Sequence, residues 1–197
     1  MRKLVAGLFV SLDGVTEAPE NWNMPYVDAE MMAAIGAQMA AADTLVLGRR
    51  TYEGFAAFWP ARAGAGDPMA DYLNAVPKLV ASTTLTETTW TNSSLIEGDV
   101  VEALRELKRG PGKDISITGS VSLVRSLLPT GVIDELAVMV HPIVVGAGAR
   151  LFDGLAGLEL SLRGSTSFAT GVVSLTYAPA ATAAGAAAGD EARRDAS

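Results

Sequence analysis

The fold of this chain is decided by residues 45–53, which read Leu45-Val46-Leu47-Gly48-Arg49-Arg50-Thr51-Tyr52-Glu53. A short apolar run passes through a glycine into a segment that Pro60 ends. The pattern predicts a buried strand over residues 44–47, a tight turn at residues 48–51 and a helix over residues 52–59. A strand that feeds a helix is the unit of parallel sheets, because parallel strands need crossover connections.

Outward from this stretch, strand-like and helix-like segments alternate along the chain. We expect further strands at residues 4–12, 78–81, 115–118 and 135–145, and helices at residues 28–42, 100–107 and 121–128. Residues 159–168 and 172–177 are typical of an antiparallel hairpin. The sequence therefore predicts an α/β fold, in which a mostly parallel central sheet is flanked by helices on both faces and followed by a C-terminal antiparallel hairpin.

One domain and a tail account for the whole length. We expect a single domain at residues 1–178, whereas residues 179–197 are rich in Ala and Gly, lack large apolar side chains and are expected to be disordered. The first residues have the outline of a short signal peptide, but no small-residue cleavage site follows, so they are interpreted as a strand. No run is long enough to span a bilayer, and a cytoplasmic protein without a membrane partner is expected.

The composition excludes several kinds of site. The 197 residues include no cysteine and a single histidine, His141, and 22 acidic against 15 basic side chains give a net charge of −7. Thiolate chemistry and disulfides are excluded, and one imidazole is too few for most catalytic zinc sites, so we expect no metal. The acidic balance argues against a nucleic-acid partner. His141 lies in an apolar strand, where a structural role is the more frequent one.

Three strand ends carry residues suited to binding phosphate. Glycine lets a backbone approach a ligand, a helix N-terminus offers N–H groups, and arginine adds bidentate anion recognition. The residues are Gly48, Arg49, Arg50 and Thr51 after the strand at 44–47, Ser82 and Thr83 after the strand at 78–81, and Thr118, Gly119 and Ser120 at the end of the strand at 115–118. In sheets of this class, ligands bind beyond the carboxyl ends of the strands. Each turn alone is also compatible with a plain polar loop, and it is their order that carries weight.

This ordered set of turns resembles the dihydrofolate reductase-like superfamily. Within the superfamily, residues 9–14 (FVSLDG), 131–136 (GVIDEL) and 141–148 (HPIVVGAG) are similar to the reductase domain of the bifunctional riboflavin-biosynthesis deaminase-reductase and its stand-alone relatives. The resemblance covers residues 1–178. It implies a reductase that transfers a hydride from NADPH to a small planar or heterocyclic substrate, such as 5-amino-6-(5-phosphoribosylamino)uracil or a related pterin.

The resemblance also assigns residues to the cofactor. Gly48, Arg49, Arg50 and Thr51 would hold the phosphates, Ser82 and Thr83 the adenosine side, and Thr118, Gly119, Ser120 and Val121 the pyrophosphate. A homodimer is implied as well, in which the strand near residues 138–145 and the C-terminal hairpin pair across a two-fold axis. Thr118 stands where riboflavin reductases usually carry an acidic residue. The alternative is therefore an NADPH-binding module that is regulatory or has lost catalysis, and a flavin-dependent protein ranks last.

Reduction also needs a proton and a pocket for the substrate. Asp13 and Asp28 are the candidate catalytic carboxylates, although Asp13 can equally bond turn amides and Asp28 can cap the helix that follows it. Trp22, Tyr26 and Phe55 are candidates for an aromatic wall around a planar substrate, and they are equally well explained as core residues.

Overall fold

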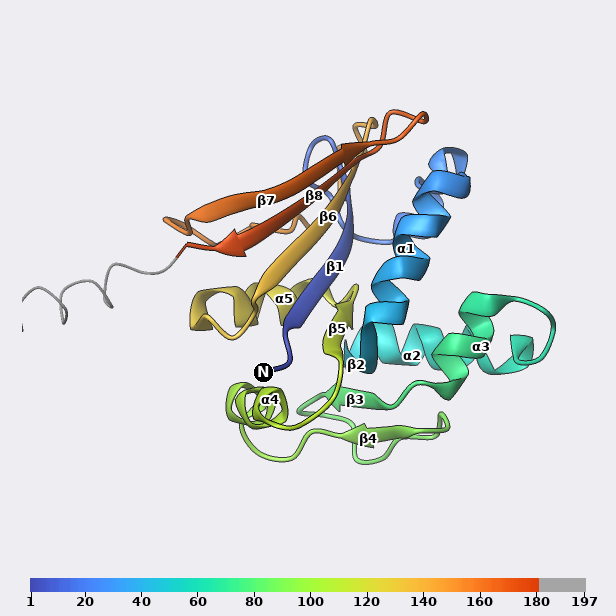
Figure 1. The fold of residues 1–197 in the computed structure, drawn as a ribbon, viewed down its shortest axis with the longest axis vertical. Coiled ribbons are helices and arrows are strands. Elements are labelled where there is room, and N and C mark those ends of the chain that lie inside the picture. The colour runs from blue at the N-terminus through green and yellow to red at the C-terminus, as the bar shows by residue number, and fades with distance from the viewer. Residues whose placement is uncertain (181–197) are drawn as a thin grey trace, which may run out of the picture.

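A computed structural model describes residues 1–180 of the chain, and the greater part of the predicted tail, residues 181–197, lies outside the described residues. Eight strands form one sheet in the order β4-β3-β2-β5-β1-β6-β8-β7 (Figure 1). The strands are β1 (Leu4–Ser11), β2 (Ala42–Gly48), β3 (Lys78–Ala81), β4 (Ser93–Leu95), β5 (Asp114–Thr118), β6 (Glu135–His141), β7 (Leu160–Ser167) and β8 (Val173–Pro179). The helices are α1 (Ala29–Ala41), α2 (Arg49–Phe58), α3 (Pro68–Ala75), α4 (Val100–Arg109) and α5 (Val121–Leu127), with short 3-10 turns at Pro19–Asn21, Met24–Tyr26, Pro60–Arg62 and Leu128–Thr130.

The sheet is parallel from β4 across to β6 and antiparallel beyond it. β1 pairs in parallel with β5 and β6, and β2 pairs in parallel with β3 and β5. The two last strands, β7 and β8, form an antiparallel hairpin that adds to β6. The prediction of an α/β fold on a mostly parallel sheet is confirmed. The carboxyl ends of β3, β2, β5, β1 and β6 therefore lie along one edge of the sheet.

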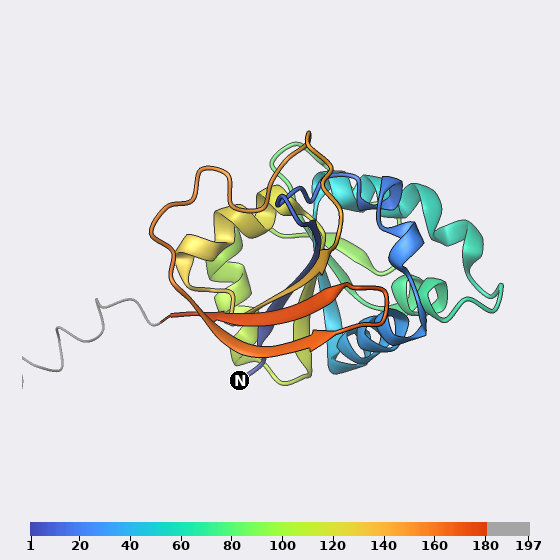
Figure 2. The ribbon, with the colours of Figure 1, turned by 90° about the horizontal axis from the view of Figure 1, so that it is seen from above.

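Helices pack on both faces because alternate residues of the central strands point to opposite sides. Val46 belongs to a core cluster with Leu104 of α4 and Val124 of α5. Its neighbours Leu45 and Leu47 pack instead in a cluster with residues of α2 and α3. Figure 2 shows this division, with α4 and α5 on one side of the sheet and α1, α2 and α3 on the other.

Two element boundaries near the predicted site residues differ from the predictions, namely the end of β6 and the start of α2. The strand predicted over residues 135–145 ends at His141, because Pro142 has no N–H for the ladder and the Ile143 amide donates to the carbonyl of His141 at 2.8 Å. The helix predicted from residue 52 begins at Arg49, so the two arginines lie in its first turn. The prediction missed α3, although Asp67 caps it and Pro68 opens it, and it missed β4, whose three residues carry no apolar alternation.

The strand β6 has partners on both of its edges, β1 on one side and β8 on the other. Its backbone therefore has no free edge, so β6 cannot pair edge to edge with a second copy, and the dimer through this strand and the C-terminal hairpin stays a prediction. The outer strand on that side of the sheet is β7. At the end of the described chain, β8 reaches Pro179, two residues beyond the predicted strand, and the Ala180 amide donates to Glu159. Within residues 1–180, no helix is both long and apolar enough to cross a membrane.

One lysine is buried in the core between β3 and α3. Lys78 is 1% exposed, and its ammonium donates to the carbonyls of Leu73 and Val76, each at 2.7 Å. The same nitrogen lies 4.2 Å from the ring centroid of Trp90, a cation–π distance. Burial nevertheless lowers the pKa of Lys78 to about 8.

We predict that this lysine makes folding stability rise in mildly alkaline solution. An unfolded lysine keeps its proton up to its ordinary pKa of 10.5, so between about 8 and 10.5 the unfolded chain binds more protons than the folded one. The free energy of unfolding should therefore rise across this interval by about 2–3 kcal/mol relative to Lys78→Met, which has no proton to lose. Urea titrations of both proteins at several pH values measure the difference, and parallel curves would contradict the prediction.

Candidate active site

The turn between β2 and α2 is open to an anion. Gly48 is the N-cap of α2, and no side chain of residues 1–180 caps the helix there. Arg49, Arg50 and Thr51 form the first turn, whose N–H groups lack intrahelical partners in any α-helix. Because the helix dipole adds partial positive charge at this end, phosphate is the natural ligand of such a turn.

The turn between β5 and α5 is bonded directly to the first one. The amide of Gly48 donates to the hydroxyl of Ser120 at 2.7 Å, and the amide of Ser120 donates to the hydroxyl of Thr51 at 3.0 Å. Gly119 has a φ of +61°, in the left-handed region, and a Cβ atom there would meet Thr51 Cγ2 at 3.4 Å. These contacts bring together residues of two turns that are about seventy positions apart in the chain.

The third predicted turn lies next to the first. Gly48 is in register with Ala81 of β3, so Ser82 and Thr83 follow at the same edge of the sheet. The hydroxyl of Ser82 already accepts the amides of Thr84 and Leu85, at 3.1 and 2.9 Å, and so closes its own turn. All the residues predicted to bind the cofactor thus lie along the ends of the neighbouring strands β3, β2 and β5. They are Gly48, Arg49, Arg50, Thr51, Ser82, Thr83, Thr118, Gly119, Ser120 and Val121.

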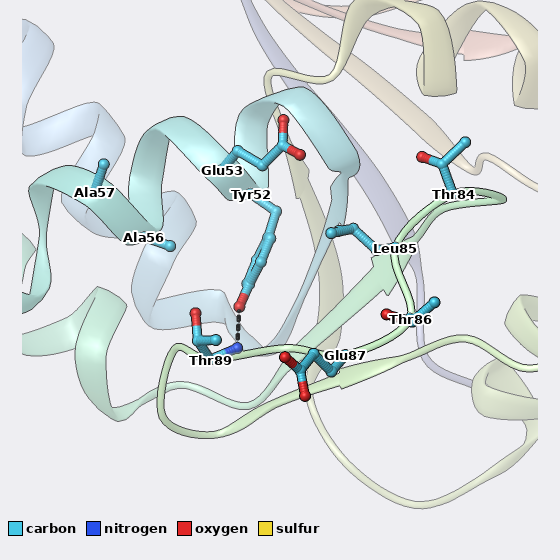
Figure 3. A pocket seen from close by; sticks show the side chains of 9 residues that line it. All are labelled: Tyr52, Glu53, Ala56, Ala57, Thr84, Leu85, Thr86, Glu87 and Thr89. Atoms are coloured by element: carbon cyan, nitrogen blue, oxygen red, sulfur yellow. Dashed lines mark hydrogen bonds between the residues drawn. The ribbon is translucent and has the colours of Figure 1, made fainter.

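An open groove of about 540 Å³ runs beside this edge, between α2 and residues 84–89 (Figure 3). Tyr52 holds the two walls together, because its hydroxyl accepts the amides of Thr89 at 2.8 Å and Trp90 at 3.0 Å. Glu53 lines the groove and forms an ion pair with Arg49 at 3.0 Å. Glu53 is not among the predicted site residues, although its spacing of four residues from Arg49 is a signal of this contact in the sequence.

Asp13, one of the two predicted catalytic carboxylates, joins two loops. Its carboxylate accepts the Ser11 hydroxyl at 2.7 Å and the amides of Val145 and Gly146 at 3.0 and 2.9 Å. These hydrogen bonds, that of Ser11 first, hold the pKa of Asp13 well below its usual range. The guanidinium of Arg150 lies 3.7 Å from the same carboxylate. The ionised carboxylate of Asp13 therefore connects the end of β1 to the segment after β6.

Asp28, the second predicted carboxylate, is the N-cap of α1. One of its oxygens accepts the amide of Met31 at 2.8 Å. Its other oxygen makes no hydrogen bond to residues 1–180, and the residue is partly exposed. Asp28 therefore caps α1 with one oxygen and leaves its second oxygen without a hydrogen bond to residues 1–180.

Two of the predicted substrate residues lie around the single histidine. The rings of Trp22, Tyr26 and Phe9 meet the His141 imidazole edge to face, with centroids 5.2, 5.8 and 5.6 Å away. His141 is fully buried, and its Nδ1 lies 2.9 Å from the carbonyl oxygen of Met139. Burial lowers the pKa of His141 and so favours the neutral imidazole. Its Nε2 has no hydrogen-bond partner in the part of the chain described, so the expected structural histidine is satisfied at one nitrogen only.

The third predicted substrate residue, Phe55, belongs to a different group. It lies on α2 and packs with Trp59, with ring centroids 6.1 Å apart, at the border of the cluster under α2 and α3. Trp22 and Tyr26 therefore lie together in the segment before α1, whereas Phe55 lies apart from them on α2.

Comparison with known proteins defines the class of this chain. The family model of the RibD C-terminal domain matches residues 2–174, so the chain belongs to this family of reductase domains with a dihydrofolate reductase-like fold. The uncharacterized protein YyaP of Bacillus subtilis (strain 168) is 27% identical over 182 residues, which cover 89% of this chain and 94% of YyaP.

Solved structures share the fold. A Shewanella sp. PV-4 protein named for riboflavin biosynthesis superposes with a TM-score of 0.73 at 21% identity, over 91% of this chain and 99% of its own. A dihydrofolate reductase from Enterococcus faecalis, complexed with NADP(H) and RAB-propyl, gives a TM-score of 0.59 at 16% identity, over 91% and 97% of the two chains.

We predict that Gly119→Ala destabilises the protein by about 1–2 kcal/mol, because alanine in the left-handed region is strained. Gly54→Ala is a matched control: Gly54 lies inside α2, none of the described residues lies within 4 Å of an added Cβ atom, and alanine there should stabilise the protein by about 0.5–1 kcal/mol. Thermal and urea unfolding measure both changes. Equal effects of the two substitutions would show that the conformation of Gly119 is not required.

We also predict that Asp13→Asn loosens the segment after β6. A neutral amide cannot accept two backbone N–H groups as well as a carboxylate does, so hydrogen exchange at the Val145 and Gly146 amides should become faster. The hydrogen bonds to the ionised carboxylate lower the pKa of Asp13, so they stabilise the folded protein at any pH above the ordinary pKa of 3.8, and this stability is lost only as the pH falls through the lower pKa of the folded state. Wild-type protection of the two amides should therefore persist at pH 4. Asp28→Asn, which keeps a good N-cap, should leave both amides unchanged.

Proposed function

We propose that this protein is an NADPH-dependent reductase that transfers a hydride to a small planar or heterocyclic substrate. The observation that carries the proposal is the bonded pair of turns at the ends of β2 and β5, with Arg49 and Arg50 in the first turn of α2. Membership of the RibD C-terminal domain family supports a reductase-type function. The E. faecalis dihydrofolate reductase with the same fold is complexed with NADP(H), which supports the choice of cofactor.

The residues present fit a dinucleotide phosphate. The uncapped first turn of α2 offers N–H groups to a phosphate of the dinucleotide, and a side chain at Gly48 would crowd Ser120, with a Cβ contact of 3.3 Å. Arginine beside a ribose favours the 2′-phosphate of NADPH over the 2′-hydroxyl of NADH. When bound, the dinucleotide supplies the hydride, and the protein positions the reactants and excludes water.

We assign the substrate side to the ends of β1 and β6. Tyr26 offers a partly exposed aromatic ring there, whereas Trp22 is only 7% exposed and packs on His141, and Phe55 on α2 is the third candidate. Of the two carboxylates, Asp28 fits better as the group that handles a proton, since Asp13 is held ionised by three hydrogen bonds. The substrate class proposed is that of a 5-amino-6-(5-phosphoribosylamino)uracil reductase or a reductase of a related pterin.

The engagement of Asp13 also favours a second candidate, an NADPH-binding module without catalysis. Thr118 in place of the family's usual acid points the same way. Cofactor binding without turnover over a panel of pterins, aminouracils and quinones would select this alternative. We also propose a homodimer and a cytoplasmic location. The dimer would form through the β7–β8 hairpin, because both edges of β6 are already paired.

We predict that the purified protein binds NADPH and that Arg49→Ala combined with Arg50→Ala weakens this binding by about tenfold to a hundredfold. A charged hydrogen bond to phosphate is worth about 1.5–3 kcal/mol, whereas NADH, which lacks the 2′-phosphate, should lose much less. Fluorescence titration of the bound nicotinamide measures both affinities. An intact fold that does not bind NADPH at high micromolar concentration would overturn the proposed function, and equal losses for both dinucleotides would remove the arginines from 2′-phosphate recognition.

A further inference from the structure

The guanidinium of Arg49 is already occupied by a carboxylate of its own helix. Its Nη1 atom lies 3.1 Å from Oε1 and 3.0 Å from Oε2 of Glu53, one helical turn away. The two side chains are 40% and 46% exposed, so the pair stands at the surface, where a ligand can reach it. Arg50, its neighbour, makes no side-chain hydrogen bond or ion pair to any residue between 1 and 180.

The surroundings of this pair are acidic. Glu53 lines one wall of the groove in Figure 3, and Glu87 lines the opposite wall. The other described residues that line the groove are neutral, and none of them is a lysine or an arginine. A phosphate that approaches Arg49 from this side therefore meets at least one carboxylate close to the guanidinium.

The ion pair itself is weak enough to yield to a ligand. Exposed pairs spaced by four residues on a helix contribute only about 0.3–0.5 kcal/mol, so a dianionic phosphate can displace Glu53 from Arg49. The Glu53 carboxylate stays one helical turn away on the same helix, however, and repels the phosphate that replaces it. A ribose hydroxyl has no such conflict, because it can donate a hydrogen bond to the carboxylate.

We propose that Glu53 is a specificity-determining residue, which lowers the affinity for nucleotides with a 2′-phosphate by neutralising and flanking Arg49. This inference rests on the proposed function, since it assumes that Arg49 meets the adenosine end of the dinucleotide. As a consequence, the ratio of the NADPH affinity to the NADH affinity is smaller than two adjacent arginines would otherwise produce. Replacing one carboxylate should widen that preference.

The test uses two probes that differ only in the phosphate of interest, adenosine 2′,5′-bisphosphate and adenosine 5′-monophosphate. Glu53→Gln keeps the size of the side chain and removes its charge. Removal of one like charge a few ångströms from the phosphate should tighten binding of the bisphosphate by about threefold to tenfold at low salt, with less effect at high salt. Binding of the monophosphate should change by less than about twofold. Isothermal titration calorimetry measures both probes, and NADPH and NADH are then compared in the same way.

Two control variants separate the local effect from total charge. Glu102→Gln breaks a similar surface pair, that of Glu102 with Arg105 on α4, and should leave both affinities at the wild-type value. Glu53→Asp keeps the charge and should keep the wild-type ratio of the two affinities within about twofold. Circular dichroism confirms that the variants are folded.

The outcomes separate this inference from the proposed function. If wild-type protein binds NADPH but Glu53→Gln tightens neither probe, or both equally, the role of Glu53 is overturned and the reductase proposal stands. The role is also overturned if Glu102→Gln tightens the bisphosphate to the same degree. If folded wild-type protein binds neither NADPH nor the bisphosphate, both proposals fall together.

Discussion

Two reciprocal hydrogen bonds hold the candidate site together: Gly48 N–H to the hydroxyl of Ser120, and Ser120 N–H to the hydroxyl of Thr51. They form only if β2 and β5 are neighbours and end at the same level, and only if the backbone turns into the left-handed region at Gly119 and Ser120. The contact therefore requires the observed sheet order and turn conformation, and it fixes the two turns relative to each other. A phosphate-binding surface made of two turns needs this rigidity, because each turn alone is an ordinary loop.

The charged residues divide between the two ends of the sheet according to their task. At the amino ends of the strands, Arg2 pairs with Asp43 and Lys108 pairs with Asp134 at 2.6 Å, and both cations are largely buried. Such pairs tie strands and helices together, because a buried charge left alone is costly. At the carboxyl ends, Arg49 and Arg50 stand at the surface, where Arg49 pairs with the exposed Glu53. The net charge of −7 thus coexists with a local basic turn.

A second set of contacts closes the opposite part of the same edge. Besides the hydrogen bonds of Asp13, the carboxylate of Glu17 accepts the Ala149 amide at 2.9 Å, and Val15 forms an isolated antiparallel β-bridge with Arg150. Trp22 and Tyr26 cover His141 from the same segment. The residues between β1 and α1 are therefore fixed by the segment after β6, from which they are separated by more than a hundred positions. This arrangement gives Asp13 a structural task at the point where a catalytic one was equally plausible from the sequence.

By itself, the sequence determined the α/β class, the parallel sheet, the closing hairpin and the residues of the three turns, because hydrophobic period and glycine position are local properties. The sequence predicted that Arg49 and Gly119 lie in turns, but it did not reveal which residues they contact. Only the tertiary structure decided that Ser120 bonds Gly48, that Asp13 is engaged by amides of a distant loop, and that β6 has no free edge. The physical reason is that these properties depend on which strands become neighbours, and strand order is set by long-range packing and crossover connections. The pairing of Arg49 with Glu53 lies between the two cases, since helical spacing permits the contact and the side chains of the folded helix realise it.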